Sequence, residues 1–338
     1  MAAIADRRVS MELIRAARAR IDGRVHRTPM LSSATAARLT EAATGSALRD
    51  DRLFVKAEHL QKTGSFKPRA ALSKLTSLTP EARAAGVITL SAGNAAQAYA
   101  WAGSVEGVAV TVTMPLRAVR SKVDASLGYG AEVVLHGEHV GETLAKLQEL
   151  VTERGLTLVH PFDDPEVIAG NASVGLEILE DLPDVDVVVV GVGGGGLISG
   201  VATALKESRP GVRVYGVEPV GSDAVSQAMA AGEVVRIDPV SVADGLGAPF
   251  AGEWTLPICS RYLDGIVLLD DATILGGLRF ATERMKQVLE PAGAAALAAV
   301  ITGRIPIHEG ERVCVVASGG NVERSRLGEF LDGPIPGA

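Results

Sequence analysis

Lys67 occupies a setting suited to amine chemistry. An apolar segment, 53–55, runs into a polar turn that ends in Ser65-Phe66-Lys67-Pro68. Proline suits the first turn of a helix, where its missing N–H costs nothing, and it biases the preceding residue toward an extended backbone. A lysine held at such a junction and partly removed from water can act as a nucleophile or form a Schiff base. The alternative is a solvated surface lysine, because lysines are rarely buried.

A glycine run is the second feature with chemical potential. Gly191–Gly196 lies between a valine-rich strand, 185–190, and a helix that begins near Leu197. Free N–H groups and the helix dipole make such a turn an anion site suited to phosphate. The run also fits G-x-G-x-x-G, and Glu218 lies at the distance of a ribose ligand, which allows a dinucleotide interpretation. Many strand–helix units precede the run, however, and four consecutive glycines form a fuller phosphate cup than that motif requires.

Two more polar turns follow expected strands. Ser91-Ala92-Gly93-Asn94-Ala95 opens a helix, so its N–H groups could bind a carboxylate; the alternative is an ordinary Ser/Asn helix cap. Ser318-Gly319-Gly320-Asn321 follows the last strand, at the sheet edge where open α/β folds bind ligands. His136 and His139 are spaced like metal ligands, but no third ligand is evident and their turn looks exposed, which favours solvated histidines.

Alternating strands and helices must position these turns. The alternation predicts an α/β fold with mostly parallel sheets, because βαβ units give parallel neighbours. The smaller lobe, 86–155, is expected to contain strands 87–90, 108–114 and 132–135 and helices 94–105, 118–127 and 141–154. The larger, discontinuous domain, 1–80 and 157–338, is expected to contain strands 185–190, 212–217 and 312–316, an irregular stretch at 221–262, and helices 271–289 and 293–303.

Composition narrows the classes of function. The 338 residues are 47% hydrophobic and 22% charged with a net charge of −7, which argues against a nucleic-acid partner. The two cysteines, Cys259 and Cys314, lie far apart, which suggests no disulfide scaffold and fits a reducing cytoplasm. The apolar stretch 187–205 is interrupted by glycines, so we expect no membrane span. No apolar secretion signal is evident in 1–10.

Taken together and in this order, the motifs resemble the fold-type II pyridoxal-phosphate enzymes, specifically the serine/threonine dehydratase and serine racemase branch. Further matching segments are Tyr129-Gly130-Ala131-Glu132-Val133, His160-Pro161-Phe162-Asp163-Asp164-Pro165, Ile168-Ala169-Gly170, Glu218-Pro219, Ala243-Asp244-Gly245 and Glu290-Pro291-Ala292-Gly293-Ala294. The resemblance covers nearly the whole chain. It implies two open twisted sheets flanked by helices, a tryptophan synthase β-like fold with the cofactor between a large and a small domain, and a homodimer.

The resemblance also implies roles for individual residues. Lys67 would be the Schiff-base lysine, with Phe66 near the cofactor ring. The pyridoxal 3′-oxygen would be bound by Asn94 and the ring nitrogen would face Ser318. The phosphate would be cradled by Gly193, Gly194, Gly195, Gly196 and the N–H of Leu197. The substrate carboxylate would meet the turn formed by Ser91, Ala92, Gly93, Asn94 and Ala95.

The implied reaction is the elimination of water from a β-hydroxy amino acid, with L-threonine and L-serine as leading substrates. A serine hydroxyl opposite the ring nitrogen makes the ring a moderate electron sink, which suits β-elimination better than a long-lived carbanion. Lys67 would take the Cα proton. The β-hydroxyl would leave as water, and the remaining product would hydrolyse to a 2-oxo acid and ammonia.

Three departures from the family pattern bear on specificity. Ala92 lacks the hydroxyl that racemases of this branch use on the second face, which favours dehydration of one enantiomer. Ala95 replaces the usual histidine. The familiar Gly-Gln-Gly-Thr reads Gly170-Asn171-Ala172-Ser173, which indicates a changed substrate shape.

The family's divalent-cation site is incomplete in this sequence. It would use Glu218 and the carbonyl of Ser222, but its second carboxylate position is Ala224, with Asp223 as a possible substitute. The resemblance therefore leaves the cation undecided. The alternatives to a dehydratase are a racemase, a β-replacement enzyme, a nicotinamide-dependent oxidoreductase built on Gly191–Gly196, and a non-catalytic protein that binds pyridoxal phosphate.

Overall fold

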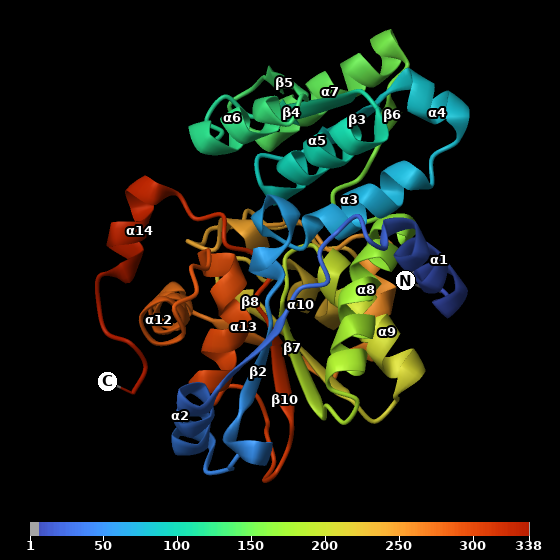
Figure 1. The fold of residues 1–338 in the computed structure, drawn as a ribbon. Coiled ribbons are helices and arrows are strands. Elements are labelled where there is room, and N and C mark those ends of the chain that lie inside the picture. Colours follow the sequence, from blue (N-terminus) through green and yellow to red (C-terminus); the bar gives the residue numbers. More distant parts are fainter. Residues whose placement is uncertain (1–6, 338) are drawn as a thin grey trace.

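The computed structural model describes residues 7–337 and contains two sheets. The larger sheet has the order β1-β2-β10-β7-β8-β9 (Figure 1). Its strands are β1 (Met30–Ser33), β2 (Leu53–Lys56), β7 (Val187–Gly191), β8 (Arg213–Pro219), β9 (Gly265–Leu269) and β10 (Val313–Val316). Only β1 runs antiparallel to its neighbour among these strands. The carboxyl ends of the five parallel strands therefore lie along one edge.

Helices cover both faces of this sheet, as its continuous apolar strands require. Along β7, Val187 and Val189 pack into one layer while Val188 and Val190 pack into the other. The first layer contains α2 (Ala34–Thr44), α12 (Asp271–Phe280) and α13 (Pro291–Ile301). The second contains α8 (Pro165–Asp181), α9 (Gly196–Ser208), α10 (Ala224–Ala231) and α11 (Thr255–Tyr262). Helix α1 (Met11–Ile21) packs on α8, and α14 (Arg324–Leu331) packs on α12.

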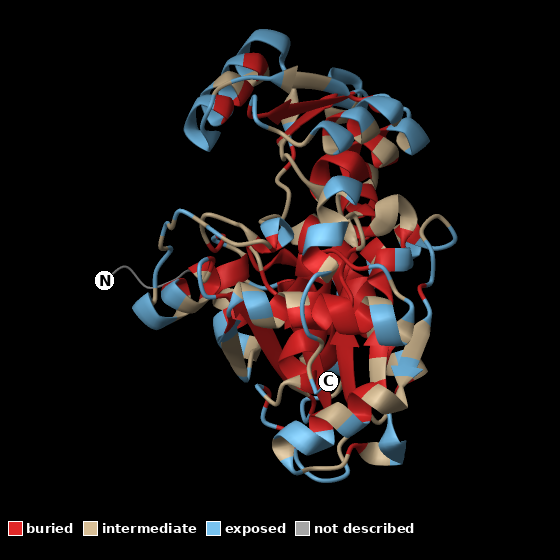
Figure 2. Cartoon of the chain, turned by 90° about the vertical axis from the view of Figure 1, so that its left-hand side faces the viewer, coloured by how far each residue is buried: buried red, intermediate tan, exposed pale blue. Residues whose placement is uncertain are grey.

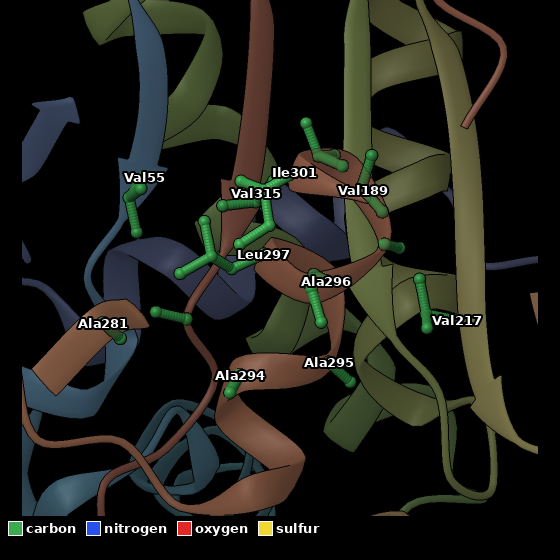
Figure 3. Close-up of a cluster of buried hydrophobic side chains, with 14 of the residues drawn as sticks. Val55, Val189, Val217, Ala281, Ala294, Ala295, Ala296, Leu297, Ile301 and Val315 are labelled. Carbon is green, nitrogen blue, oxygen red and sulfur yellow. The ribbon is translucent and has the colours of Figure 1, made fainter. Parts of the chain in front are cut away.

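Helix α13 lies directly on the sheet. Figure 3 shows Leu297 and Ala296 of this helix beside Val55 of β2, Val315 of β10 and Val189 of β7. All residues of α13 are buried, and most are alanine or glycine. Small side chains allow the helix backbone to approach the strands closely, so α13 is fixed relative to the sheet. Its first turn is thereby held at the edge where the parallel strands end.

The smaller sheet has the order β5-β4-β3-β6, and all of its strand pairs are parallel. Its strands are β3 (Val87–Leu90), β4 (Val110–Met114), β5 (Glu132–Leu135) and β6 (Thr157–Leu158). The helices of this lobe are α4 (Pro80–Ala85), α5 (Asn94–Glu106), α6 (Arg120–Gly128) and α7 (Val140–Arg154). Figure 2 shows that its outer helices are exposed, whereas buried ribbon is concentrated in the larger lobe.

Helix α3 (Lys67–Thr76) joins the two lobes. Ala71, Leu72 and Leu75 belong to the same apolar cluster as α5 and the smaller sheet, while the helix also packs against α8 of the larger lobe. Figure 1 shows α3 between the two parts of the molecule. The residue that opens this helix, Lys67, therefore lies where the lobes meet.

The predicted α/β architecture with two mostly parallel sheets is confirmed. The larger domain was expected to resume at residue 157, and β6 (Thr157–Leu158) pairs with β3 in the smaller sheet; the domain division itself stays a prediction. The assignment of substrate to the smaller domain and cofactor to the larger one stays a prediction.

Several elements differ from their expected bounds. Within the irregular stretch, α10 and α11 form, and β9 follows it as an unexpected strand. The helix expected at 271–289 ends as α12 at Phe280 and continues as a π-helical turn, Ala281–Met285. Residues 1–6, part of the segment searched for a secretion signal and of the expected larger domain, lie outside the described residues, as does residue 338. Among residues 7–337, no helix combines the length and apolarity that a membrane crossing needs.

Candidate active site

Two turns that are distant in sequence are joined at the edge where the parallel strands end. The Phe66 N–H donates to the Ser318 carbonyl at 3.1 Å, and Ser65 and Gly319 form an isolated antiparallel bridge. The turn before α3 is thus attached to the turn after β10. This pairing places the backbone of Lys67 next to the turn that carries Ser318.

Lys67 is half-buried, and its amine has partners within the protein. Its Nζ donates to the Pro161 carbonyl at 3.0 Å and lies 5.0 Å from the centre of the Phe66 ring. Burial lowers the pKa of this amine from 10.5 to about 8, and the nearby Glu290 carboxylate opposes that shift. About a tenth of the amine is therefore uncharged at pH 7, far more than for a solvated lysine, and available for reaction with a carbonyl group. The alternative of an ordinary surface lysine does not describe this environment.

The glycine loop between β7 and α9 presents its N–H groups outward. The Gly194 carbonyl accepts a hydrogen bond from Thr255 Oγ1 at 2.7 Å, and the Gly196 carbonyl accepts one from Asn171 Nδ2 at 3.1 Å. Gly195 has φ of 86°, a left-handed conformation that favours glycine. Within residues 7–337, the N–H groups of 193–197 have no acceptor. They are therefore available to an anion at the positive end of a 13-residue helix.

The wall behind the loop is tight enough to require glycine. A Cβ on Gly194 would lie 2.5 Å from the Phe162 ring, and one on Gly196 would lie 2.8 Å from the Phe162 carbonyl oxygen. Real Cβ atoms do not approach so closely without a displacement of their neighbours. A cradle of free N–H groups near a half-buried amine of lowered pKa fits a compound that carries both a phosphate and an aldehyde. Pyridoxal phosphate is such a compound, so the residues present fit the expected cofactor.

Asn94, which opens α5 of the smaller lobe, is held by two residues of the larger lobe. Its Nδ2 donates to Glu290 Oε1 at 2.7 Å, and its Oδ1 accepts from Asn321 Nδ2 at 2.9 Å. These partners fix the orientation of the amide, whose second N–H is left for a ligand. Burial, together with Asp244, raises the pKa of Glu290 to about 7. Sequence reasoning did not assign a role to Glu290, although Pro291 directly after it indicated the start of a helix at this position.

The turn between β3 and α5 combines a cap with open N–H groups. Ser91 Oγ accepts from the Gly93 N–H at 3.1 Å, and Gly93 is the N-cap of α5. Within the described part of the chain, the N–H groups of Asn94 and Ala95 have no acceptor. The Ser91 side chain thus closes the turn before the helix and does not cap α5 itself, and the carboxylate site at these open N–H groups stays a prediction. The neighbouring Ala92 offers only a methyl group.

Ser318 retains most of its hydrogen-bonding capacity. The side chain is buried, and its Oγ lies 3.5 Å from the Ala292 carbonyl. This contact is at the outer limit for an O–H···O bond. The hydroxyl is therefore free to rotate toward a ligand between Ser318 and Lys67.

The segment 160–165, which follows β6, forms one wall of the site. In the sequence this segment was notable only because it matches the family pattern. His160 Nδ1 accepts from the Asp163 N–H at 2.8 Å, and burial lowers the pKa of His160. An Nδ1 that accepts a hydrogen bond keeps the ring neutral with its proton on Nε2. The carbonyl of Pro161 binds Lys67, and Phe162 backs the glycine loop. Only the spatial pairing of residues about a hundred positions apart reveals this wall.

The Glu218 carboxylate makes its hydrogen bonds within the larger lobe. It accepts from the N–H groups of Val225 and Ser226, each at 2.9 Å, and from Ser226 Oγ at 2.6 Å. It therefore caps α10 and does not face the glycine loop as a ribose ligand would.

The residues considered as metal ligands do not form a metal site. Ser222 Oγ donates to the Leu246 carbonyl. Among the described residues, no three His, Cys, Asp or Glu side chains gather as a metal site, and His136 and His139 are both exposed.

Comparisons with known proteins agree with this geometry. A family model described as pyridoxal-phosphate dependent enzyme matches residues 22–319. An L-threonine ammonia-lyase of Geobacter sulfurreducens is 43% identical over 80% of this chain and 67% of its own length. The catabolic L-threonine dehydratase of Escherichia coli is 39% identical over 95% of this chain and 96% of its own. The structure of maize serine racemase superposes with a TM-score of 0.88 at 34% identity, covering 95% of this chain and 96% of that chain.

Proposed function

Because this chain belongs to the family of pyridoxal-phosphate dependent enzymes, we propose that it eliminates water from a β-hydroxy amino acid, L-threonine first and L-serine second, and releases a 2-oxo acid and ammonia. The observation that carries the proposal is the half-buried Lys67, whose amine has a pKa lowered to about 8, together with a glycine loop that has free N–H groups. Relatives along most of the chain bear the names L-threonine ammonia-lyase and dehydratase.

The cofactor would be held by residues from both lobes. Lys67 would hold its aldehyde carbon, and Phe66 would lie near its ring. The N–H groups of Gly193–Gly196 and Leu197 would bind its phosphate. Asn94 would donate to its 3′-oxygen, and Ser318 would face its ring nitrogen. When bound, pyridoxal phosphate supplies an electron-poor ring that draws electron density away from the substrate Cα.

Lys67 would act as the base for the Cα proton. A general base works best with a pKa near the operating pH, and burial brings the pKa of this amine to about 8. Its hydrogen bond to the Pro161 carbonyl restrains the amine at the edge of the larger sheet. Lys67 can therefore accept a proton at Nζ without leaving its place.

The turn 91–95 would bind the substrate carboxylate. The Ser91 hydroxyl and the N–H groups of Asn94 and Ala95 can donate to it together, at the positive end of α5. The likeness to maize serine racemase is the observation that favours racemisation instead. Ala92 carries no group that could return a proton on the second face, so elimination is the better-supported reaction.

The proposal can be tested with a panel of amino acids. The holoenzyme would be incubated with L-threonine, L-serine and D-serine, and the 2-oxo acid, ammonia and both serine enantiomers would be measured. We expect equal amounts of 2-oxo acid and ammonia from the L-amino acids and no D-serine from L-serine. Production of D-serine as the main product would support the racemase instead. A new thioether formed when a thiol is added would identify a β-replacement enzyme, and no reaction with any amino acid would indicate a silent binding protein.

The proposal extends to assembly and location. A homodimer and a cytoplasmic location are supported by the family resemblance, and the two cysteines, Cys259 and Cys314, are free and buried. Light scattering coupled to gel filtration would test the dimer. A divalent cation is not part of the proposal, because the Glu218 carboxylate already accepts three hydrogen bonds from α10 and the second carboxylate position of the family's cation site is Ala224.

A further inference from the structure

Arg69, two residues after Lys67, is among the most deeply buried charged side chains of the described chain, with 1% exposure. Its guanidinium binds two carboxylates in forked pairs. Nε and Nη2 donate to the two oxygens of Glu58, both at 2.8 Å. Nη1 and Nη2 donate to the two oxygens of Glu177 at 2.6 and 2.9 Å. Nη1 also donates to Ser173 Oγ at 3.1 Å.

A second buried cation completes the group. Lys56 has no exposed surface, and its Nζ lies 2.7 Å from Glu177 Oε2 and 2.8 Å from the Thr28 carbonyl. We refer to Arg69, Lys56, Glu58 and Glu177 as the Arg69 cluster. Its two cations face its two carboxylates, and Lys56 Nζ also lies 3.3 Å from the partly exposed Asp181 carboxylate. Such buried networks gain little stability over apolar packing, because desolvation of the charges offsets their attraction. Their forked geometry does fix the positions of the elements that carry them.

The Arg69 cluster fastens the first turn of α3 to the larger lobe. Glu58 follows strand β2, whereas Glu177 lies on α8. The remainder of α3 packs against α5 of the smaller lobe. The first turn is therefore the part of the helix that two independent elements of the larger lobe hold in place.

The attachment of Arg69 also affects Lys67, which lies two residues earlier on the same helix. Residues two apart on a helix point about 200° away from each other, since each residue turns the chain by about 100°. Arg69 therefore faces the larger lobe while Lys67 faces the opposite side, toward the site. A fork that fixes the rotation of the first turn also fixes the direction of the Lys67 side chain. We propose that Arg69 is a positioning residue that sets the place and the burial of the Lys67 amine. This inference rests on the proposed function, because the proposed function makes Lys67 the residue that binds the cofactor and takes the Cα proton.

Variants that separate geometry from charge test the inference. Arg69→Lys keeps the buried charge balanced, but an ammonium cannot form two planar forks. Arg69→Met with Glu58→Gln removes one cation and one anion together, so no unpaired buried charge remains. Arg279→Met is the matched control: Arg279 is also buried, but it donates to the Phe330 carbonyl at the C-terminal helix.

The readout is the rate at which apo protein captures added pyridoxal phosphate, measured by absorbance as a function of pH. Capture requires the uncharged amine, so the wild-type midpoint should lie near pH 8. With a loosened first turn, water reaches the amine, and the midpoint should rise by about one pH unit in both Arg69 variants. We also expect kcat for L-threonine to fall roughly tenfold to a hundredfold while KM changes less than about threefold. Arg279→Met should lower the melting temperature and leave the midpoint unchanged.

Two results would separate this inference from the proposed function. If the folded Arg69→Lys or double variant captures the cofactor with the wild-type midpoint and rate, Arg69 does not position Lys67, whatever the activity. If wild-type protein captures the cofactor with a midpoint near pH 8 but converts no β-hydroxy amino acid, the proposed function is wrong. The comparison of midpoints between wild type and the Arg69 variants still decides the role of Arg69.

Discussion

Substitution of Gly196 by alanine should separate cofactor binding from folding. A Cβ at this position would meet the Phe162 carbonyl oxygen and Cβ, each at 2.8 Å. Ordinary contact begins near 3.4 Å, so the start of α9 must move by about 0.6 Å away from that wall. The obstacle is largely backbone of the segment after β6, which cannot rotate out of the way as a side chain would.

The displacement is large enough to break hydrogen bonds to a phosphate. N–H···O bonds cluster near 2.9 Å, and a shift of about 0.6 Å takes them to the limit of hydrogen bonding. A hydrogen bond to a charged group contributes about 1.5–3 kcal/mol, so losing two of them costs roughly 3 kcal/mol or more. The Kd of pyridoxal phosphate should therefore rise at least about a hundredfold.

The assay is titration of apo protein with pyridoxal phosphate, followed by absorbance, beside thermal unfolding of the apo form. Gly103→Ala is the matched control: its Cβ would lie 2.7 Å from the Val108 carbonyl oxygen, at the far end of α5. We expect Gly103→Ala to lower the melting temperature and leave the Kd within about threefold. A Gly196→Ala protein that binds the cofactor as tightly as the wild type would refute the assignment of the loop as the phosphate site.

Three other substitutions give distinct outcomes. Thr255→Val removes the hydroxyl that holds the Gly194 carbonyl at 2.7 Å, and the cofactor Kd should rise about fivefold, for a loss of about 1 kcal/mol; an unchanged Kd would contradict this. Burial raises the pKa of Glu218 from 4.5 to about 7. The folded state therefore binds more protons than the unfolded state over that interval, and the free energy of unfolding falls as pH rises through it. Glu218→Gln should reduce this fall by about 3 kcal/mol in urea unfolding of the apo protein, unless the carboxyl titrates normally, in which case the slope will not change. Ala92→Ser restores a hydroxyl on the second face, so D-serine should form from L-serine; chiral chromatography showing none would mean that this hydroxyl alone is not sufficient.

Local patterns in the sequence predicted elements better than the relations between them. The valine strand β7 was predicted from its continuous run of valines, and the structure shows those side chains alternating between two covered faces. Pro68 correctly marked the start of α3. Strand β9 was missed because its residues are mostly half-exposed and follow a proline-containing stretch without clear periodicity. The helix expected through residue 289 breaks earlier at a π-helical turn, for which the sequence offers no proline or glycine signal.

The sequence indicated the individual candidate residues of the site but not the hydrogen bonds and ion pairs between them. Lys67, the glycine loop and Ser318 could each be recognised from their own turns. The partners that tune them could not: Glu290 lies 196 positions from Asn94, and Glu177 lies 108 positions from Arg69. A buried charge becomes visible only when the fold removes it from water and supplies a counter-charge. From the sequence alone, Arg69 was one more arginine on a helix.

The measurement that tests the central claim most directly is the release of 2-oxo acid and ammonia from L-threonine by the wild-type holoenzyme and by Lys67→Ala, each reconstituted with pyridoxal phosphate. Borohydride treatment and peptide mapping would locate any cofactor attached to the chain. We expect equimolar products from the wild type, the reduced cofactor on the peptide that contains Lys67, and neither result from the variant. Turnover by Lys67→Ala at the wild-type rate, or cofactor attached to another lysine, would contradict the account.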